Sequence, residues 1–277
     1  MPQLASPHQI LNRIIYKNQL KIERSFKSNF ILGAYGGAFI AIAGLFYIII
    51  SAGDTAIFYG LKKLLGSLVF TTGFVLVLVG GADIYTSNTM LAINVINKKM
   101  SASAFSKNLM NVYFANFIGA MIFLAFVILG KVHLQGGGVV ADSILHIGSA
   151  KMQHGFIEAL SLGILCNFLV CLAFWMSMGS ETAIGKISSL MLPIAAFVAG
   201  GFEHSVANMF LLPLALFVKE ALPMDLWSAI GAQASDYAHI NFYNAIVNNL
   251  IPVTIGNFIG GAIFVGAFYN LAYGQKD

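Results

Sequence analysis

The sequence predicts an all-α integral membrane protein of six transmembrane helices, arranged as an inverted repeat (3+3) in which the second and fifth helices are broken. Composition, the length of the apolar runs and an internal duplication predict this fold class. Of the 277 residues, 58% are hydrophobic and 9% are charged, against about 25% charged in an ordinary soluble domain. Because so few charges cannot cover a globule of this size with water, lipid must contact most of the surface.

The composition and the motifs exclude several classes of protein. A soluble enzyme, a nucleic-acid-binding domain and a disordered chain are inconsistent with so apolar a sequence, and we expect no nucleic acid partner. Cys166 and Cys171 lie in one apolar run, without metal-ligand or disulfide spacing. The sequence has no phosphate-binding glycine loop ending in Lys-Ser/Thr. We therefore predict neither a metal nor a cofactor.

The transmembrane helices are predicted by six apolar runs, since a bilayer core requires about 20 apolar residues per helix. These runs cover residues 29–50, 64–98, 108–130, 155–178, 187–218 and 243–272. We expect one transmembrane domain over 29–272, a cytoplasmic N-terminal segment over 1–28 and a cytoplasmic tail over 273–277. Both termini are placed in the cytoplasm because ten Lys and Arg residues then lie inside and five lie outside.

The N-terminal segment combines basic residues with apolar side chains at helical spacing. These apolar residues are Ile10, Leu11, Ile14 and Ile15. The pattern is typical of an amphipathic helix at a membrane interface, and a helix packed against its own protein fits it equally well.

The internal duplication joins the third and sixth runs. Residues 108–123 (NLMNVYFANFIGAMIF) and 249–264 (NLIPVTIGNFIGGAIF) align without gaps, and nine of the sixteen positions are identical. We infer two repeats of three helices each, over about 29–130 and 155–272. An odd number of helices per repeat inverts one repeat relative to the other in the membrane.

Each repeat contains one interrupted run. The second run breaks at GGADIYTSNTM (80–90) and the fifth at GGFEHSVANM (200–209). Non-helical backbone at membrane depth is tolerated only where it is buried in protein or lines a wet cavity. Paired broken helices in two inverted repeats therefore point to a transport site. We expect Ser87 and Ser205 to cap the half-helices that follow the breaks.

Three ionisable residues fall within the breaks: Asp83, Glu203 and His204. Each costs about 2.5–3.5 kcal/mol at bilayer depth, so a function is the default explanation. For Asp83 and Glu203 we favour a role in capping or pinning the loop, because both lie just before a resumed helix and their charge would repel an anion. Imidazole alone changes charge near neutral pH when unperturbed, so we expect His204 to be functional, with Thr86 as its counterpart in the other break.

Large apolar residues and two amides flank the breaks. The apolar residues are Phe70, Phe74, Ile84 and Phe197. They suit either ordinary packing or hydrophobic constrictions that exclude hydrated ions. Asn167 and Asn257 suit either interhelical hydrogen bonding or the lining of a pore.

Five motifs together resemble the formate/nitrite transporter family, and most closely its formate channel branch. They are GGADIYTS, KNLMNVYFANFIGA, LGILCNFLVCLAFWMS, GFEHSVANMF and NLIPVTIGNFIGG, and the resemblance covers roughly residues 27–272. It implies an aquaporin-like protomer, a homopentamer with a pore in each subunit, and a place in a bacterial-type cytoplasmic (inner) membrane.

The resemblance also implies roles for individual residues. His204 is expected to be the central pore histidine, with Thr86 as its partner and with Asn167 and Asn257 nearby. It implies one constriction at Phe70, Phe74 and Ile84 and the opposite one at Phe197. Lys151 and Glu203 are expected to tune the charge around the histidine.

The function expected from these observations is passive or proton-linked transport of small monovalent anions, formate first. Nitrite, hydrosulfide, acetate and lactate remain alternatives on the same scaffold, and a neutral-solute channel is a further one. An intramembrane enzyme that uses Asp83, Glu203 and His204 would lack a nucleophile and a binding domain, so we expect no catalytic activity.

Overall fold

The computed structural model describes residues 4–53 and 57–274, and these residues form helices and loops without a β-strand. The first half contains α1 (Pro7–Ile22), α2 (Phe26–Ser51), α3 (Tyr59–Gly80), α4 (Tyr85–Asn88), η1 (Thr89–Leu91), α5 (Ala92–Ile96) and α6 (Ala102–Leu129). The second half contains η2 (Val132–Gly138), α7 (Val139–Met152), α8 (Phe156–Ser177), α9 (Ala183–Ala199), α10 (Ser205–Ala221), α11 (Met224–Ala229), η3 (Ala234–Tyr237), η4 (Asn244–Leu250), α12 (Ile251–Phe258), η5 (Ile259–Ala267) and α13 (Phe268–Tyr273). The all-α prediction is confirmed.

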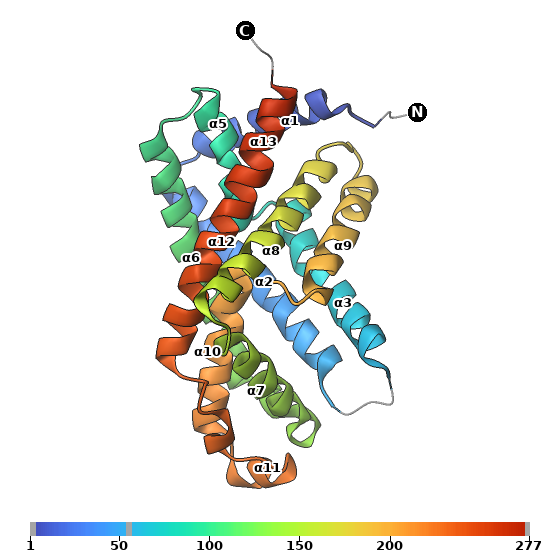
Figure 1. Cartoon of the computed structure of the whole chain (residues 1–277), viewed down its shortest axis with the longest axis vertical. Helices are drawn as coiled ribbons and strands as arrows, with labels where there is room; N and C mark the ends of the chain where they lie inside the picture. The colour runs from blue at the N-terminus through green and yellow to red at the C-terminus, as the bar shows by residue number, and fades with distance from the viewer. Residues whose placement is uncertain (1–3, 54–56, 275–277) are drawn as a thin grey trace.

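The six expected membrane crossings correspond to helices of the structure. The helices α2, α3, α6 and α8 and the continuous stretch Asn244–Tyr273 are each long and apolar enough to cross a membrane. The remaining crossing consists of α9, with 17 residues, and α10 beyond the break. Helices α1 and α13 lie at one end of the molecule, and α7 and α11 lie at the other (Figure 1).

Both chain breaks have the same backbone course. Helix α3 is followed by Gly81 (φ 81°) and α9 by Gly200 and then Gly201 (φ 71°); both positive φ values lie in the left-handed region that glycine adopts without steric cost. The backbone is then extended at Ile84 (φ −123°) and His204 (φ −111°), directly before α4 and α10 begin. The glycine pairs that predict the breaks thus end the two half-helices.

An asparagine side chain holds each break in the same way. The Asn116 amide accepts a hydrogen bond from the Tyr85 N–H (2.8 Å) and donates one to the Asp83 carbonyl (2.9 Å). In the second half, Asn257 accepts from the Ser205 N–H (2.9 Å) and donates to the Glu203 carbonyl (2.9 Å). The predicted duplication is therefore repeated at the level of single hydrogen bonds.

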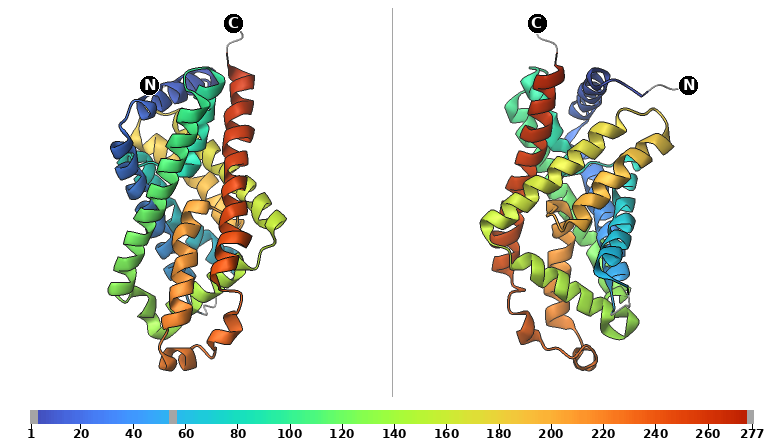
Figure 2. Two further views of the ribbon diagram at one scale, coloured as in Figure 1. Left: turned by 90° about the vertical axis from the view of Figure 1, so that its left-hand side faces the viewer. Right: turned by 45° about the vertical axis from the view of Figure 1, so that its right-hand side comes forward.

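The equivalence extends beyond the repeats expected at 29–130 and 155–272, because α1 corresponds to α7. Lys21 and Arg24, at the end of α1 and just after it, form ion pairs with Asp83. The equivalent residues 130 positions later are Lys151, at the end of α7, and His154, just after it. Both form ion pairs with Glu203. Helix α7 falls in a segment expected to be only a connection, and the views in Figure 2 show it at the opposite end from α1.

Helix α1 packs against its own protein, which is one of the two arrangements that its pattern allows. Ile10, Leu11 and Ile14 are buried in a cluster with Trp175 and Val265. Of the terminal segments defined from the sequence, residues 1–3 and 275–277 lie outside the described residues.

Two glycines allow the helices of each half to approach closely. A Cβ atom at Gly119 on α6 would collide with the Ala34 carbonyl of α2, and one at Gly260 would collide with the Ile164 carbonyl of α8. These equivalent contacts pack the unbroken membrane helices closely against each other in each half. The two broken helices meet between these packed pairs.

Candidate permeation site

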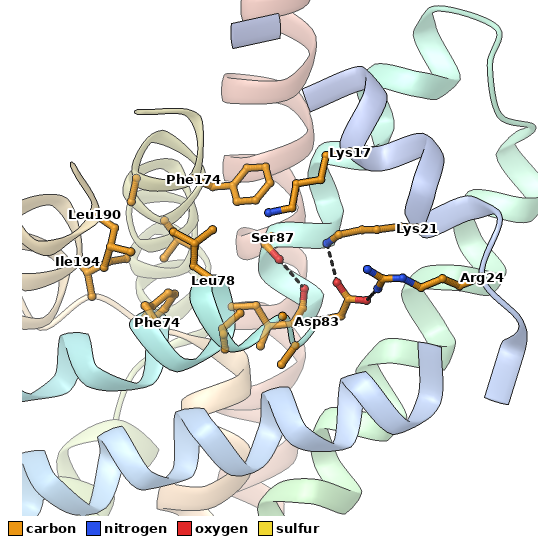
Figure 3. A pocket seen from close by; sticks show the side chains of 16 residues that line it. Lys17, Lys21, Arg24, Phe74, Leu78, Asp83, Ser87, Phe174, Leu190 and Ile194 are labelled. Atoms are coloured by element: carbon orange, nitrogen blue, oxygen red, sulfur yellow. Dashed lines mark hydrogen bonds and ion pairs between the residues drawn. The ribbon is translucent and has the colours of Figure 1, made fainter. Parts of the chain in front are cut away.

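Two cavities approach the breaks from opposite ends of the molecule. The cavity at the α1 end encloses about 70 Å³, and its lining includes Lys17, Lys21, Arg24, Phe74, Asp83 and Ile84 (Figure 3). The cavity at the α7 end encloses about 240 Å³, and its lining includes Lys63, Phe70, Lys151, Phe197, Glu203 and His204. Each cavity thus has both cations and aromatic residues in its lining.

A compact aromatic cluster separates the two cavities. The Phe74 ring lies 5.5 Å from the His204 ring and 5.8 Å from the Phe197 ring, between centroids. The Phe197 ring also lies 5.9 Å from the His204 ring. Since Phe74 lines one cavity and the other two rings line the second, the contacts among these three rings form the barrier.

The grouping of the predicted constriction residues differs from the expectation. Phe70 lies with Phe197, at 5.9 Å between ring centroids, and both line the cavity at the α7 end. Phe74 and Ile84 line the other cavity. Phe70 and Phe74 lie on the same face of α3, but Phe70 is one turn farther from the break and so lines the other cavity.

The two breaks meet at a hydrogen bond between His204 and Thr86. The Thr86 hydroxyl oxygen lies 2.9 Å from His204 Nε2, and both side chains are buried. His204 is also the N-cap of α10, since its Nδ1 accepts from the Ala207 N–H at 3.1 Å. Because Nδ1 accepts this hydrogen bond, the single N–H proton of the neutral ring is on Nε2. Nε2–H therefore donates to the Thr86 hydroxyl oxygen.

This arrangement corrects two sequence expectations. Ser87 and Ser205 are not N-caps, because Ile84 and His204 hold those positions. The position equivalent to His204 in the first repeat is Ile84, 120 residues earlier. Thr86, on α4, reaches the imidazole from the other break.

Asn167 and Asn257 lie behind this pair rather than along either cavity. The Asn167 amide donates to the Thr86 carbonyl (3.2 Å) and to the Asn257 carbonyl (2.5 Å). Asn257 holds the backbone of the second break, as described above. Both amides hydrogen-bond between helices, which is one of the two roles considered from the sequence, and they fix where Thr86 and His204 meet.

Asp83 and Glu203 pin the breaks through ion pairs. Both side chains are buried. Asp83 Oδ1 lies 2.7 Å from Lys21 Nζ, and Asp83 Oδ2 lies 2.7 Å from Arg24 Nη1. Glu203 Oε1 lies 2.7 Å from Lys151 Nζ. A buried carboxylate requires such compensation.

The charge on His154 depends on Glu203. His154 lies between α7 and α8, with its Nε2 3.7 Å from Glu203 Oε1 and its Nδ1 2.9 Å from Glu158 Oε1. The interaction with Glu203, opposed by partial burial, raises the pKa of His154 above its usual range. The mouth of this cavity therefore becomes more positive as the pH falls.

A family model for formate/nitrite transporters matches residues 8–271. The chain belongs to the formate/nitrite transporter family. It is 38% identical to the formate channel FocA of Escherichia coli strain K12, over 90% of this chain and 87% of that protein. It is 34% identical to the formate channel BtFdhC of Bacillus thuringiensis, over 98% and 96%. Members of this family are channels and transporters.

Solved structures agree with this assignment. A pentameric formate channel with formate bound superposes with a TM-score of 0.85, at 38% identity, over 90% of this chain and 98% of that one. An ion channel of the same family superposes with a TM-score of 0.81 at 24% identity, over 95% and 98%, which supports the fold alone. The fold class predicted from the sequence is confirmed.

Sequence reasoning missed the partners of the two acids in the breaks, apart from Lys151. Lys21, Arg24 and His154 lie outside the apolar runs. Charged residues are common in such segments, so their presence there does not indicate a site. The amides Asn88 and Asn208 were missed too; Lys21 donates to the first at 2.6 Å, and the second donates to Glu203 at 2.6 Å. Asn88 and Asn208 are 120 residues apart, as are Asp83 and Glu203, and this shared offset is the signal that could have identified the two amides.

Proposed function

We propose that this protein is a passive or proton-linked channel for small monovalent anions and that formate is its substrate. One observation carries the proposal: cavities from both ends of the molecule converge on the aromatic cluster at the Thr86–His204 hydrogen bond. The formate channels among its relatives support the choice of anion.

The chemistry of the site favours passage of a neutralised anion. Cations at each mouth attract the anion, while the aromatic cluster imposes a desolvation cost on any charge that enters it. A proton shared between His204 and the carboxylate removes most of that cost. Because Nε2 already carries hydrogen, the ring gains a proton only at Nδ1, after the Ala207 N–H is released.

The remaining site residues have supporting roles in this proposal. Phe70 and Phe197 form the constriction on one side of the histidine, and Phe74 and Ile84 form the one on the other. Asn167 and Asn257 position the Thr86–His204 pair. An enzymatic use of Asp83 or Glu203 is not favoured, because ion pairs engage both carboxylates.

We further propose a homopentamer in a bacterial-type inner membrane, with both termini in the cytoplasm. The pentameric relative supports the assembly, and the ten-to-five distribution of positive charge supports the orientation. Native mass spectrometry of the detergent-solubilised protein tests the subunit count. Protease access to a C-terminal tag in spheroplasts, where only the outer face is exposed, tests the orientation, and cleavage there would contradict it.

Transport is tested by uptake of labelled formate into proteoliposomes. We expect uptake that saturates, that is accompanied by proton entry, and that nitrite, hydrosulfide, acetate or lactate inhibits less strongly than unlabelled formate. His204→Phe should abolish the pH dependence. Swelling of the same vesicles in glycerol, without uptake of formate, would favour the neutral-solute channel instead.

A further inference from the structure

Lys17 on α1 places an ammonium group in the cavity at the α1 end without a carboxylate partner. Its Nζ lies 5.1 Å from the centroid of the Phe174 ring. In Figure 3 the amine points into the cavity, toward Phe174 and Ser87. Among residues 4–53 and 57–274, no Asp or Glu forms an ion pair with Lys17.

The other cations of this cavity are already engaged. Lys21 Nζ lies 2.7 Å from Asp83 Oδ1 and donates to Asn88 Oδ1 at 2.6 Å. Arg24 Nη1 donates to Asp83 Oδ2 at 2.7 Å. The charge of Asp83 is thus compensated twice, and Lys17 keeps its hydrogen-bond donors for another group.

The second half of the molecule has no equivalent of Lys17. The offset of 130 residues that relates Lys21 to Lys151 relates Lys17 to Ile147. Ile147 lines the cavity at the α7 end. The inverted repeat therefore accounts for the paired cations but not for Lys17, which is a feature of one mouth.

The surroundings of Lys17 weaken the preference for its charged form, although Asp83 acts in the opposite direction. Burial, followed by the nearby charge of Lys21, lowers the pKa of Lys17 to about 8. Phe174 supports the ammonium on one side but supplies no negative charge. A carboxylate that enters the cavity would offset this desolvation. The Ser87 hydroxyl, which also lines the cavity, already donates to the Ile84 carbonyl at 3.1 Å, so Lys17 is the donor left for the anion.

We propose that Lys17 forms a docking site for one small carboxylate at the α1 end, which the anion occupies before it reaches His204. This inference rests on the proposed function and adds to it an asymmetry between the two mouths. Occupancy of the site lowers the formate concentration that half-saturates flux from the α1 end. Flux from the α7 end does not depend on it.

The test measures formate flux from each side of proteoliposomes whose orientation is known from protease access to a C-terminal tag. Lys17→Gln should raise the half-saturating formate concentration about tenfold from the α1 end, the effect of losing one hydrogen bond to a charged group, and leave the maximal flux unchanged. Lys27→Gln, an exposed lysine at the same end, is the matched control and should change neither value.

A second arm of the test varies the charge of Lys17 by changing the pH. The charges of Lys21 at the end of α1, Arg24 just after it, Asp83 in the break and Lys186 on α9 act on Lys17 and are the same in every variant. From pH 7 to pH 9 the wild-type half-saturating concentration should rise as Lys17 loses its proton. Lys17→Arg keeps its charge at every accessible pH, so it should show a smaller rise.

The outcomes separate this inference from the proposed function. If the wild type takes up no formate, the proposed function fails, whatever the variants do. If the wild type takes up formate and Lys17→Gln matches it from both sides, the docking site is refuted. An equal loss from both sides also refutes it, because that result would indicate a general change in the channel. If Lys17→Gln does not assemble, the pH comparison of wild type with Lys17→Arg decides.

Discussion

At the residue scale, His204 combines two tasks that sequence patterns treat separately. It caps α10 through Nδ1 and contacts the opposite repeat through Nε2. The cap fixes the tautomer, and the tautomer makes the ring a donor toward Thr86. The sequence indicated a functional histidine in the break, but it could not indicate the cap, because serine is the commoner capping residue and one stands directly after the histidine.

Thr86→Val tests the hydrogen bond between the repeats. Valine keeps the shape but leaves the buried Nε2–H without an acceptor, which should lower the free energy of unfolding by about 1–3 kcal/mol. Thr86→Ser retains the hydroxyl and should lose less. Chemical denaturation in detergent measures both variants, and equal stability of Thr86→Val and wild type would mean that the bond is not maintained.

The raised pKa of His154 gives a pH dependence of stability. A base whose pKa is raised on folding stabilises the protein fully below its ordinary pKa of about 6.5, and this contribution is lost as the pH rises through the folded value. We expect the difference in melting temperature between wild type and His154→Gln to shrink from pH 6 to higher pH. A difference that grows with pH would contradict the ion pair with Glu203.

At the element scale, the two short helices α1 and α7 hold the breaks in place. Each element contributes cations to the buried acid of one break, although α1 precedes the first predicted span and α7 follows the third. The six crossings could be predicted from hydropathy, because lipid selects apolar residues over a fixed length. The roles of α1 and α7 could not, because ion pairs such as Lys21–Asp83 join residues far apart in the sequence.

Asp83→Asn tests whether α1 is held by its ion pairs. Removing one partner of a buried pair leaves Lys21 uncompensated, which should cost about 3–5 kcal/mol in unfolding free energy. The double variant Lys21→Met/Asp83→Leu should recover part of that loss. Arg13→Gln, which breaks an exposed pair with Glu181, is the control and should cost at most about 1 kcal/mol. Equal effects of Asp83→Asn and Arg13→Gln would refute this role for α1.

At the scale of the whole molecule, duplication explains why one site has two mouths. Asn116 and Asn257 hold equivalent breaks, and Asp83 and Glu203 anchor them. The residues that line the two cavities are not all equivalent. Ile84 in one half corresponds to His204 in the other, so only one half supplies an imidazole. The duplication could be predicted from 108–123 and 249–264. The aromatic barrier could be predicted only residue by residue, since its grouping depends on which chamber each side chain faces.

The position of the passage is tested most directly by opening the barrier. Phe197→Ala removes the ring that contacts both Phe74 and His204, whereas Phe123→Ala removes a partly buried ring that packs against Phe210, away from both cavities. Formate uptake and glycerol permeation are measured in proteoliposomes of each variant. We predict that Phe197→Ala alone conducts formate faster and admits glycerol. If both variants behave like wild type, the passage does not run beside His204.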